Sequence, residues 1–268
     1  LRPNKIVSRP TCAPSTSPRT PSPHVQPPGV QPSNPPHLDA QANQPQPVMD
    51  NQETTHQLFD AAENNNIEEA AAALDAGADI EADRYRGFRV TPLAWAALYG
   101  RVEIAALLLD RGAHVNGMNE SGQTALRGAS RTGHIEVAEL LVSRGASLEV
   151  ADQNGLTPLL WAVCAGKHEM ATWLLDQGAR MDVVTSRGNT ALHLAVGSGY
   201  PDFARLLQDA NVAAMVGAKA GWFGWTALHW AAVSGRPNHL RLLLEAGATV
   251  DVTDASQRTA LHLACRHG

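Results

Sequence analysis

Aromatic residues are scarce in this 268-residue chain, since Phe, Trp and Tyr together make up 5% of it. Hydrophobic residues nevertheless amount to 44%, so the core must be built from aliphatic side chains and alanine. Cysteine is also rare: Cys12, Cys164 and Cys265 lie far apart and form no CxxC pair. This spacing argues against a disulfide framework or a zinc site, and it predicts a reducing, intracellular setting in the cytoplasm or nucleus.

The chain also lacks an excess of positive charge and any long apolar run. It carries 21 Lys and Arg against 26 Asp and Glu, a formal net charge of -5. A protein that binds nucleic acid regardless of sequence needs surplus cations to neutralise phosphates, so this class is disfavoured. Two stretches without Asp, Glu, Lys or Arg are candidates for membrane spans. Residues 20–38 are too rich in proline and polar residues, and residues 220–235 are too short and too rich in glycine, so no span is expected.

Proline is concentrated at one end of the chain. Of the 17 prolines, 13 lie in residues 1–50, which contain no aromatic residue. Such a segment cannot bury enough apolar surface to offset the entropy lost on ordering, so we expect a disordered, proline-rich tail over 1–50. The tail carries a net charge of +2, which leaves -7 for residues 51–268.

The remainder of the chain is an internal repeat. A threonine recurs between positions 91 and 259 at spacings of 33, 33, 33, 36 and 33 residues. Counted from that threonine, position +2 is leucine, +5 is alanine and +9 is glycine in all six copies. Threonine is a good helix N-cap, leucine and alanine at this spacing form an apolar stripe, and glycine can end a helix in the left-handed conformation. Leu-Leu at +16 and +17, with Trp173 replacing one leucine, indicates a second helix before a turn-rich loop.

This motif set resembles the ankyrin repeat, through Thr-Pro-Leu-Ala-Trp-Ala-Ala at 91–97 and Thr-Ala-Leu-His-Trp-Ala-Ala at 226–232. The resemblance implies an all-α ankyrin-repeat solenoid, in which helix–turn–helix repeats carry short β-hairpin loops. We expect this domain over 51–268, with a degenerate first repeat, five full repeats and a truncated sixth. Asn65 replaces the glycine of the degenerate repeat, because asparagine is the next best residue in a left-handed conformation. Three extra residues before Thr226 predict an enlarged hairpin there.

No constellation of catalytic or metal-binding residues stands out. Histidine occupies position +3 in only three of the six copies, at His193, His229 and His262, so these residues build no ligand set. The resemblance implies that they are structural and bond the N-cap threonine and the neighbouring loop. We therefore expect no enzyme activity, no cofactor, no metal and no small-molecule substrate.

The resemblance implies a non-catalytic scaffold that binds a protein or peptide partner on a concave surface of hairpins and inner helices, and we expect it to be monomeric. The contact positions it implies are those just before each threonine and those at +7 and +8. The partner-binding residues expected on this basis, together with the aromatic residues of the first and fourth hairpins, are Tyr85, Phe88, Val90, Tyr99, Gln123, Arg131, Leu156, Arg187, Trp222, Phe223, Trp225 and Arg258.

Two other functions are compatible with the sequence. In the first, the chain is the recognition arm of a larger multidomain enzyme or signalling protein. In the second, it binds nucleotides or nucleic acid by stacking bases on Trp222 and Trp225. The net charge of -7 on the repeat array disfavours the second. The sequence also leaves two roles open for Trp222, Phe223 and Trp225: they project as an anchor for a partner, or they fold back to cover a gap in the irregular fourth repeat.

Overall fold

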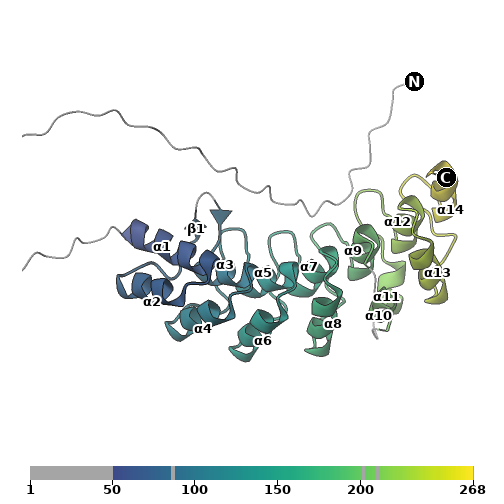
Figure 1. Ribbon diagram of the computed structural model, residues 1–268. Helices are drawn as coiled ribbons and strands as arrows, with labels where there is room; N and C mark the ends of the chain where they lie inside the picture. Colours follow the sequence, from purple (N-terminus) through teal and green to yellow (C-terminus); the bar gives the residue numbers. More distant parts are fainter. Residues whose placement is uncertain (1–50, 86–87, 201–202, 209–211, 268) are drawn as a thin grey trace, which may run out of the picture. The chain divides into compact units, whose positions relative to one another are not determined.

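The computed structural model describes residues 51–85, 88–200, 203–208 and 212–267. The predicted tail over 1–50 therefore lies outside the described residues, and its disorder stays a prediction. Within the described residues, helices stack in pairs along the chain, and the loop before each inner helix projects from the same side of the stack (Figure 1). This arrangement confirms the all-α solenoid that the repeat predicts.

The helices form two rows. The inner row, next to the projecting loops, consists of α1 (Asn51–Asn64), α3 (Pro92–Leu98), α5 (Ala125–Thr132), α7 (Pro158–Cys164), α9 (Ala191–Ser198), α12 (Ala227–Val233) and α14 (Ala260–His267). The outer row consists of α2 (Ile67–Asp75), α4 (Val102–Asp110), α6 (Ile135–Ser143), α8 (His168–Asp176), α10 (Phe203–Leu206) and α13 (Pro237–Glu245). A short helix, α11 (Val212–Gly217), follows α10, and the first loop contains the antiparallel pair β1 (Arg84–Tyr85) and β2 (Phe88–Arg89).

The recurring threonine begins the inner helices as an N-cap. The side-chain oxygens of Thr91, Thr124 and Thr157 accept hydrogen bonds from the backbone N–H three residues later, at 3.2, 3.2 and 3.4 Å. The first turn of a helix leaves N–H groups without partners inside the helix, and the threonine oxygen satisfies one of them. The N-cap function expected from the repeat is thereby confirmed in these three copies.

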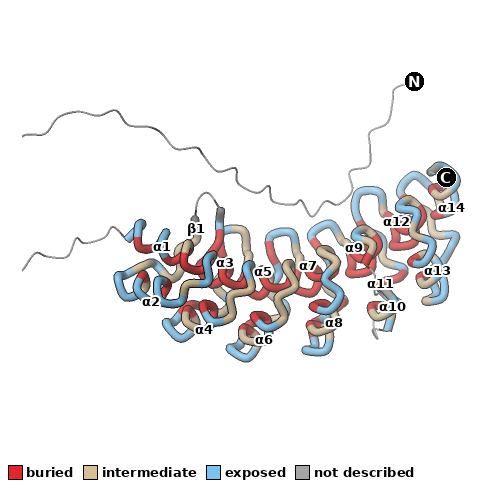
Figure 2. The backbone as a smooth tube through the Cα atoms, in the orientation of Figure 1, coloured by how far each residue is buried: buried red, intermediate tan, exposed pale blue. Residues whose placement is uncertain are grey.

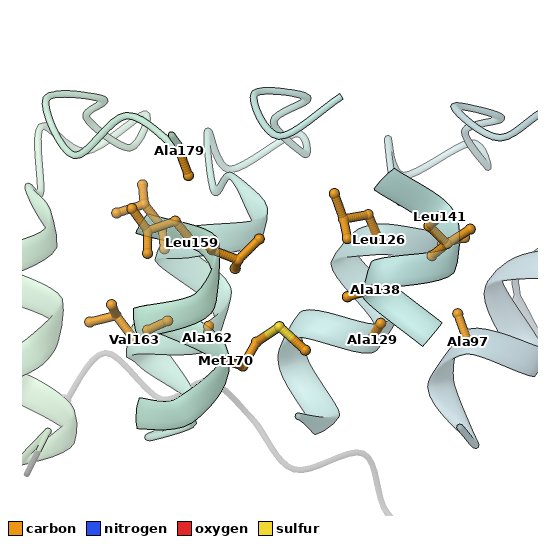
Figure 3. Packing of buried hydrophobic residues seen from close by; sticks show 14 of the residues in the cluster. Ala97, Leu126, Ala129, Ala138, Leu141, Leu159, Ala162, Val163, Met170 and Ala179 are labelled. Carbon is orange, nitrogen blue, oxygen red and sulfur yellow. The ribbon is translucent and has the colours of Figure 1, made fainter. Parts of the chain in front are cut away.

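The repeat's leucine and alanine form the core between successive inner helices. In α3, α5, α7, α9 and α12 the leucine at +2 is at most 3% exposed and the alanine at +5 is fully buried. Figure 2 shows the buried stretches following the inner row, while the tips of the loops are exposed. In Figure 3, Leu126 and Ala129 of α5 lie in one apolar layer with Ala138 and Leu141 of α6. Because alanine is small, neighbouring inner helices can approach closely enough to exclude water.

Asn65 ends α1 in the conformation that the glycines adopt elsewhere. Its φ is 59°, and the glycines at +9 in the full repeats have φ between 61° and 91°. Asparagine tolerates this left-handed region better than most residues with a side chain, so the substitution predicted from the degenerate repeat is confirmed.

The prediction of an enlarged hairpin before Thr226 is mostly wrong. The turn closed by backbone hydrogen bonds between Ala220 and Trp225 has four intervening residues, against three between Asn119 and Gln123 in the second loop. The additional chain instead lies in α11, which contacts α9 and α12. Met215 and Val216 of α11 are each 3% exposed. The burial of these two side chains gives the extra residues a place in the core rather than at the loop tip.

The last helix, α14, has one apolar side uncovered. Leu261 occupies the +2 position, and it is 72% exposed where its counterparts are buried. Repeat proteins gain stability from contacts between neighbours, so a helix with a neighbour on one side only is held less firmly.

We predict that α14 opens before the middle of the array. Backbone amides of α14 should exchange with deuterium at least about tenfold faster than those of α5 and α7, because fewer apolar contacts oppose local unfolding. Native-state hydrogen exchange read by mass spectrometry measures this directly. Equal protection of α14 and α5 would contradict the prediction.

Candidate functional site

The loops before the inner helices, here called fingers, form a continuous row. The fingers are the eight residues before each repeat threonine: 83–90, 116–123, 149–156, 182–189, 218–225 and 251–258. Neighbouring tips are joined by single backbone hydrogen bonds, such as Ser186 N–H to Asn154 O at 2.9 Å and Ala255 N–H to Phe223 O at 2.8 Å. These bonds fix the spacing of the fingers, so a partner would meet one surface rather than independent loops.

Histidine joins an inner helix to the next finger. The Nδ1 atom of His193 accepts hydrogen bonds from the backbone N–H of Thr190 at 3.3 Å and from its hydroxyl at 2.8 Å. Its Nε2 lies 3.0 Å from the carbonyl oxygen of Trp225 in the next finger. A carbonyl can only accept, so Nε2 carries a proton. Because Nδ1 accepts from the Thr190 N–H, it carries none, and the imidazole is neutral. His229 repeats the arrangement with the carbonyl of Arg258 at 3.1 Å, which confirms the structural role implied for both residues.

Burial keeps these imidazoles neutral. It lowers the pKa of His193 from 6.5 to about 4, although backbone hydrogen bonds to Trp225 and Ala218 act in the opposite direction. Burial also lowers the pKa of His229 and of His239 on α13. Protonation would place a charge at the junction between repeats, where burial penalises it.

We predict that the protein loses stability in mild acid. The unfolded chain takes up a proton at His193 near pH 6.5, whereas the folded chain does so only near pH 4, so the folded state binds fewer protons in that interval. Stability is therefore full above pH 6.5 and falls by roughly 2–3 kcal/mol from this residue as the pH drops towards 4. Urea unfolding between pH 4 and 8 measures it. His193→Asn should flatten the pH dependence and the exposed His114→Asn should not; an unchanged slope in His193→Asn would contradict the assignment.

The fifth finger, residues 218–225 after the fourth full repeat, divides its aromatic residues between the core and the surface. Trp225 is 3% exposed, and its indole N–H donates to Asp254 Oδ2 of the next finger at 3.1 Å. Its ring lies 5.4 Å from those of Phe223 and Trp230. Trp222 is 93% exposed and Phe223 is 49% exposed. The sequence left two roles open, and the structure divides the residues between them. Trp225 is packed into the irregular repeat, whereas Trp222 and part of Phe223 face solvent.

Asp254 holds the fifth and sixth fingers together. It is buried, and its oxygens accept from the Trp225 indole, from the backbone N–H groups of Ser256 and Arg258, and from the Arg258 guanidinium at 2.8 and 3.0 Å. Burial would raise the pKa of Asp254, but these hydrogen bonds, led by those of Arg258, hold it well below its usual range. The guanidinium of Arg258 is engaged in this structural ion pair, which leaves it less available to a partner.

We predict opposite consequences for the two tryptophans of this finger. Trp225→Ala should lower the free energy of unfolding by about 3 kcal/mol or more, because it empties a buried site and removes one of the donors to Asp254. Trp222→Ala should lower it by less than about 1 kcal/mol, as for a surface position. Denaturant unfolding of the two single variants makes the comparison. Similar losses in both would contradict the division between core and surface.

The first finger and the helix after it contain the other expected aromatic contacts. The side chains of Tyr85 and Phe88 lie outside the described residues. Val90 is 8% exposed, so little of its side chain is open to a partner. Tyr99 is 37% exposed, and its ring lies 5.0 Å from that of Trp95. Burial, followed by the charge of Glu63, raises the pKa of the Tyr99 hydroxyl.

The remaining expected contact residues line the fingers and α5. Gln123 and Leu156 are partly exposed at the bases of the second and third fingers, and Arg187 is exposed on the fourth repeat's finger. Arg131 is partly exposed at the end of α5, and burial lowers its pKa. The structure thus places these four side chains at or near the face formed by fingers and inner helices, without gathering them into one cluster.

Arg127 was not among the expected contacts, and it lies one helical turn before Arg131. Its guanidinium carbon lies 4.3 Å from the centre of the Trp161 ring on α7. Burial, together with the charge of Arg131, lowers the pKa of Arg127 to about 10, while the charge of Asp152 acts in the opposite direction. The sequence signal was present but easily overlooked, since Arg127 occupies the +3 position that three other repeats give to histidine.

The described residues hold no group of three or more His, Cys, Asp or Glu side chains arranged to bind a metal ion. None of the helices in the described part of the chain is long and apolar enough to cross a membrane. Cys265 is a free, exposed thiol.

Paired helices that stack along one axis and project a row of fingers define a class of repeat protein built for recognition. The comparison with protein families identifies which one. A family described as ankyrin repeats, in three copies, matches residues 58–152, 144–216 and 213–268. These matches cover most of the chain, and the chain belongs to the ankyrin repeat family. A comparison with curated proteins found no match.

Proposed function

We propose that this chain is a non-catalytic scaffold that binds a protein or peptide partner on the surface formed by its fingers and inner helices. Ankyrin repeats are generally protein–protein interaction modules. The observation that carries the proposal is the fifth finger, where Trp222 is 93% exposed on a loop that Trp225 and Asp254 anchor to the array. An exposed tryptophan on a rigid support suits a binding hot spot, because little conformational entropy is lost when it is covered.

The proposal extends to the properties expected from the sequence. We propose a monomer that acts inside the cell, in the cytoplasm or nucleus, without a cofactor or a small-molecule substrate. A role as the recognition arm of a larger enzyme or signalling protein is compatible with the same binding surface. Binding of nucleotides or nucleic acid is the weaker candidate, because the array carries a net charge of -7.

We predict that removal of the exposed aromatics abolishes partner binding without unfolding the array. The full chain is immobilised, and proteins it retains from cell extract are identified by mass spectrometry and then titrated individually. Trp222→Ala with Phe223→Ala should weaken binding of a genuine partner by about 30-fold or more, the size typical of a hot spot.

A matched control is Leu244→Ala on α13, which also truncates an exposed apolar side chain but lies on the outer row. It should leave affinity within about twofold. Partners that bind the double variant and the wild type equally well would contradict the fifth finger as the anchor. Partners whose binding is lost only on substitution of the outer row would contradict the proposed surface as a whole.

A further inference from the structure

The inner helices α3, α5, α7, α9 and α12 are almost free of charge. Apart from histidine, Arg127 and Arg131 are the only ionisable cations or anions of their sequences, and both belong to α5. The array as a whole carries a net charge of -7. Two positive side chains therefore stand alone among otherwise uncharged inner helices of an acidic domain.

Unlike Arg89 and Arg258, these two arginines have no carboxylate bound to them. Arg89 pairs with Glu120, and Arg258 pairs with Asp254. Among the described residues, no side-chain hydrogen bond or ion pair joins the guanidinium of Arg127 or Arg131 to another residue. The Nε atom of Arg127 is buried without a hydrogen-bond partner, as are those of Arg101 and Arg236, so only its terminal nitrogens could meet a ligand.

Neighbouring side chains hold Arg127 in place but leave its donors unused. The guanidinium lies against the face of Trp161, 4.3 Å from the ring centre. The carboxylate of Asp152, which corresponds to Asp254 three repeats later, is occupied by other donors: its Oδ2 accepts from the Trp161 indole at 2.9 Å, and its Oδ1 accepts two backbone N–H groups. Asp152 and Trp161 thus form a rigid support, on which Arg127 lies without a hydrogen bond.

We propose that Arg127 and Arg131 form a carboxylate-binding subsite for an Asp or Glu side chain of a protein partner. The proposal rests on the proposed function and names the chemistry of the partner. Residues four apart on a helix share a face, so both guanidiniums can reach one carboxylate. Their planar donor groups match a carboxylate, and partial burial strengthens such a contact relative to one in open water. Because the rest of the array is acidic, a carboxylate elsewhere would be repelled, so this subsite also sets the register of the partner.

The test uses random 16-residue peptides displayed on phage and selected on the full chain. Peptides selected by the wild type should share an Asp or Glu at a fixed position. Replacing that residue by Asn or Gln in the synthetic peptide should weaken binding to the wild type at least about tenfold, the effect of losing one charge-assisted contact. The same replacement should change binding to Arg127→Gln with Arg131→Gln less than about twofold, because the contact is already absent.

Matched variants separate loss of the subsite from loss of the fold. Arg131→Gln alone leaves the stack of Arg127 on Trp161 intact, and Arg241→Gln removes an exposed arginine from α13 of the outer row. Arg131→Gln should weaken binding and Arg241→Gln should not, with both retaining the thermal midpoint of the wild type.

The outcomes distinguish the two proposals. Selected peptides without a shared acidic residue, or peptides that bind the arginine variants as tightly as the wild type, would overturn the subsite while leaving the binding scaffold in place. If a peptide with phosphoserine at the shared position binds more tightly than the peptide with glutamate, the subsite is also overturned, since its ligand would then be a phosphate. Failure to select any peptide would count against the proposed function and the subsite together.

Discussion

The stack depends on how backbone groups are satisfied where an inner helix meets the next finger. Each finger must turn back on itself between two repeats, and a turn in that position has N–H and C=O groups that water reaches poorly. The protein meets this requirement with a threonine at the helix start and, in the fourth and fifth repeats, with a neutral histidine that reaches across to the next finger's carbonyl, as His193 does to Trp225. The burial of leucine and alanine gives the repeats their cohesion, but these hydrogen bonds determine where each finger lies.

Recognition by this surface follows from the same constraint. Trp222 can stand in solvent because Trp225, three residues later, is fixed from below by Asp254 and by the carbonyl bond to His193. Arg127 lies against Trp161 for an equivalent reason, since Asp152 holds the indole. In both places the carboxylate of a finger aspartate accepts from a tryptophan indole and positions its ring. Under the proposed function, Trp222 and Arg127 beside these rings face the partner, and the acidic array favours partners that offer an apolar side chain and a single carboxylate.

Features that depend on one repeat alone could be predicted from the sequence. The threonine caps, the buried leucine and alanine, and the left-handed Asn65 each follow from residues a few positions apart, and the 33-residue period shows them several times over. Features that depend on two repeats could not be predicted in this way. The indole of Trp225 is held by a hydrogen bond to Asp254, 29 positions later. The guanidinium of Arg127 lies over the ring of Trp161, 34 positions later. The short helix α11 escaped prediction because its packing needs α9 and α12 in place on both sides.

The most direct test of this account is the protonation state of His193 in the folded protein. Nitrogen-15 NMR of the imidazole distinguishes the two neutral tautomers from each other and from the charged form. The account predicts that His193 carries its proton on Nε2 alone and remains neutral well below pH 6.5, with a pKa of about 4. An imidazole that titrates near pH 6.5, or one protonated on Nδ1, would contradict the hydrogen bond to the next finger and with it the basis for the arrangement of the row.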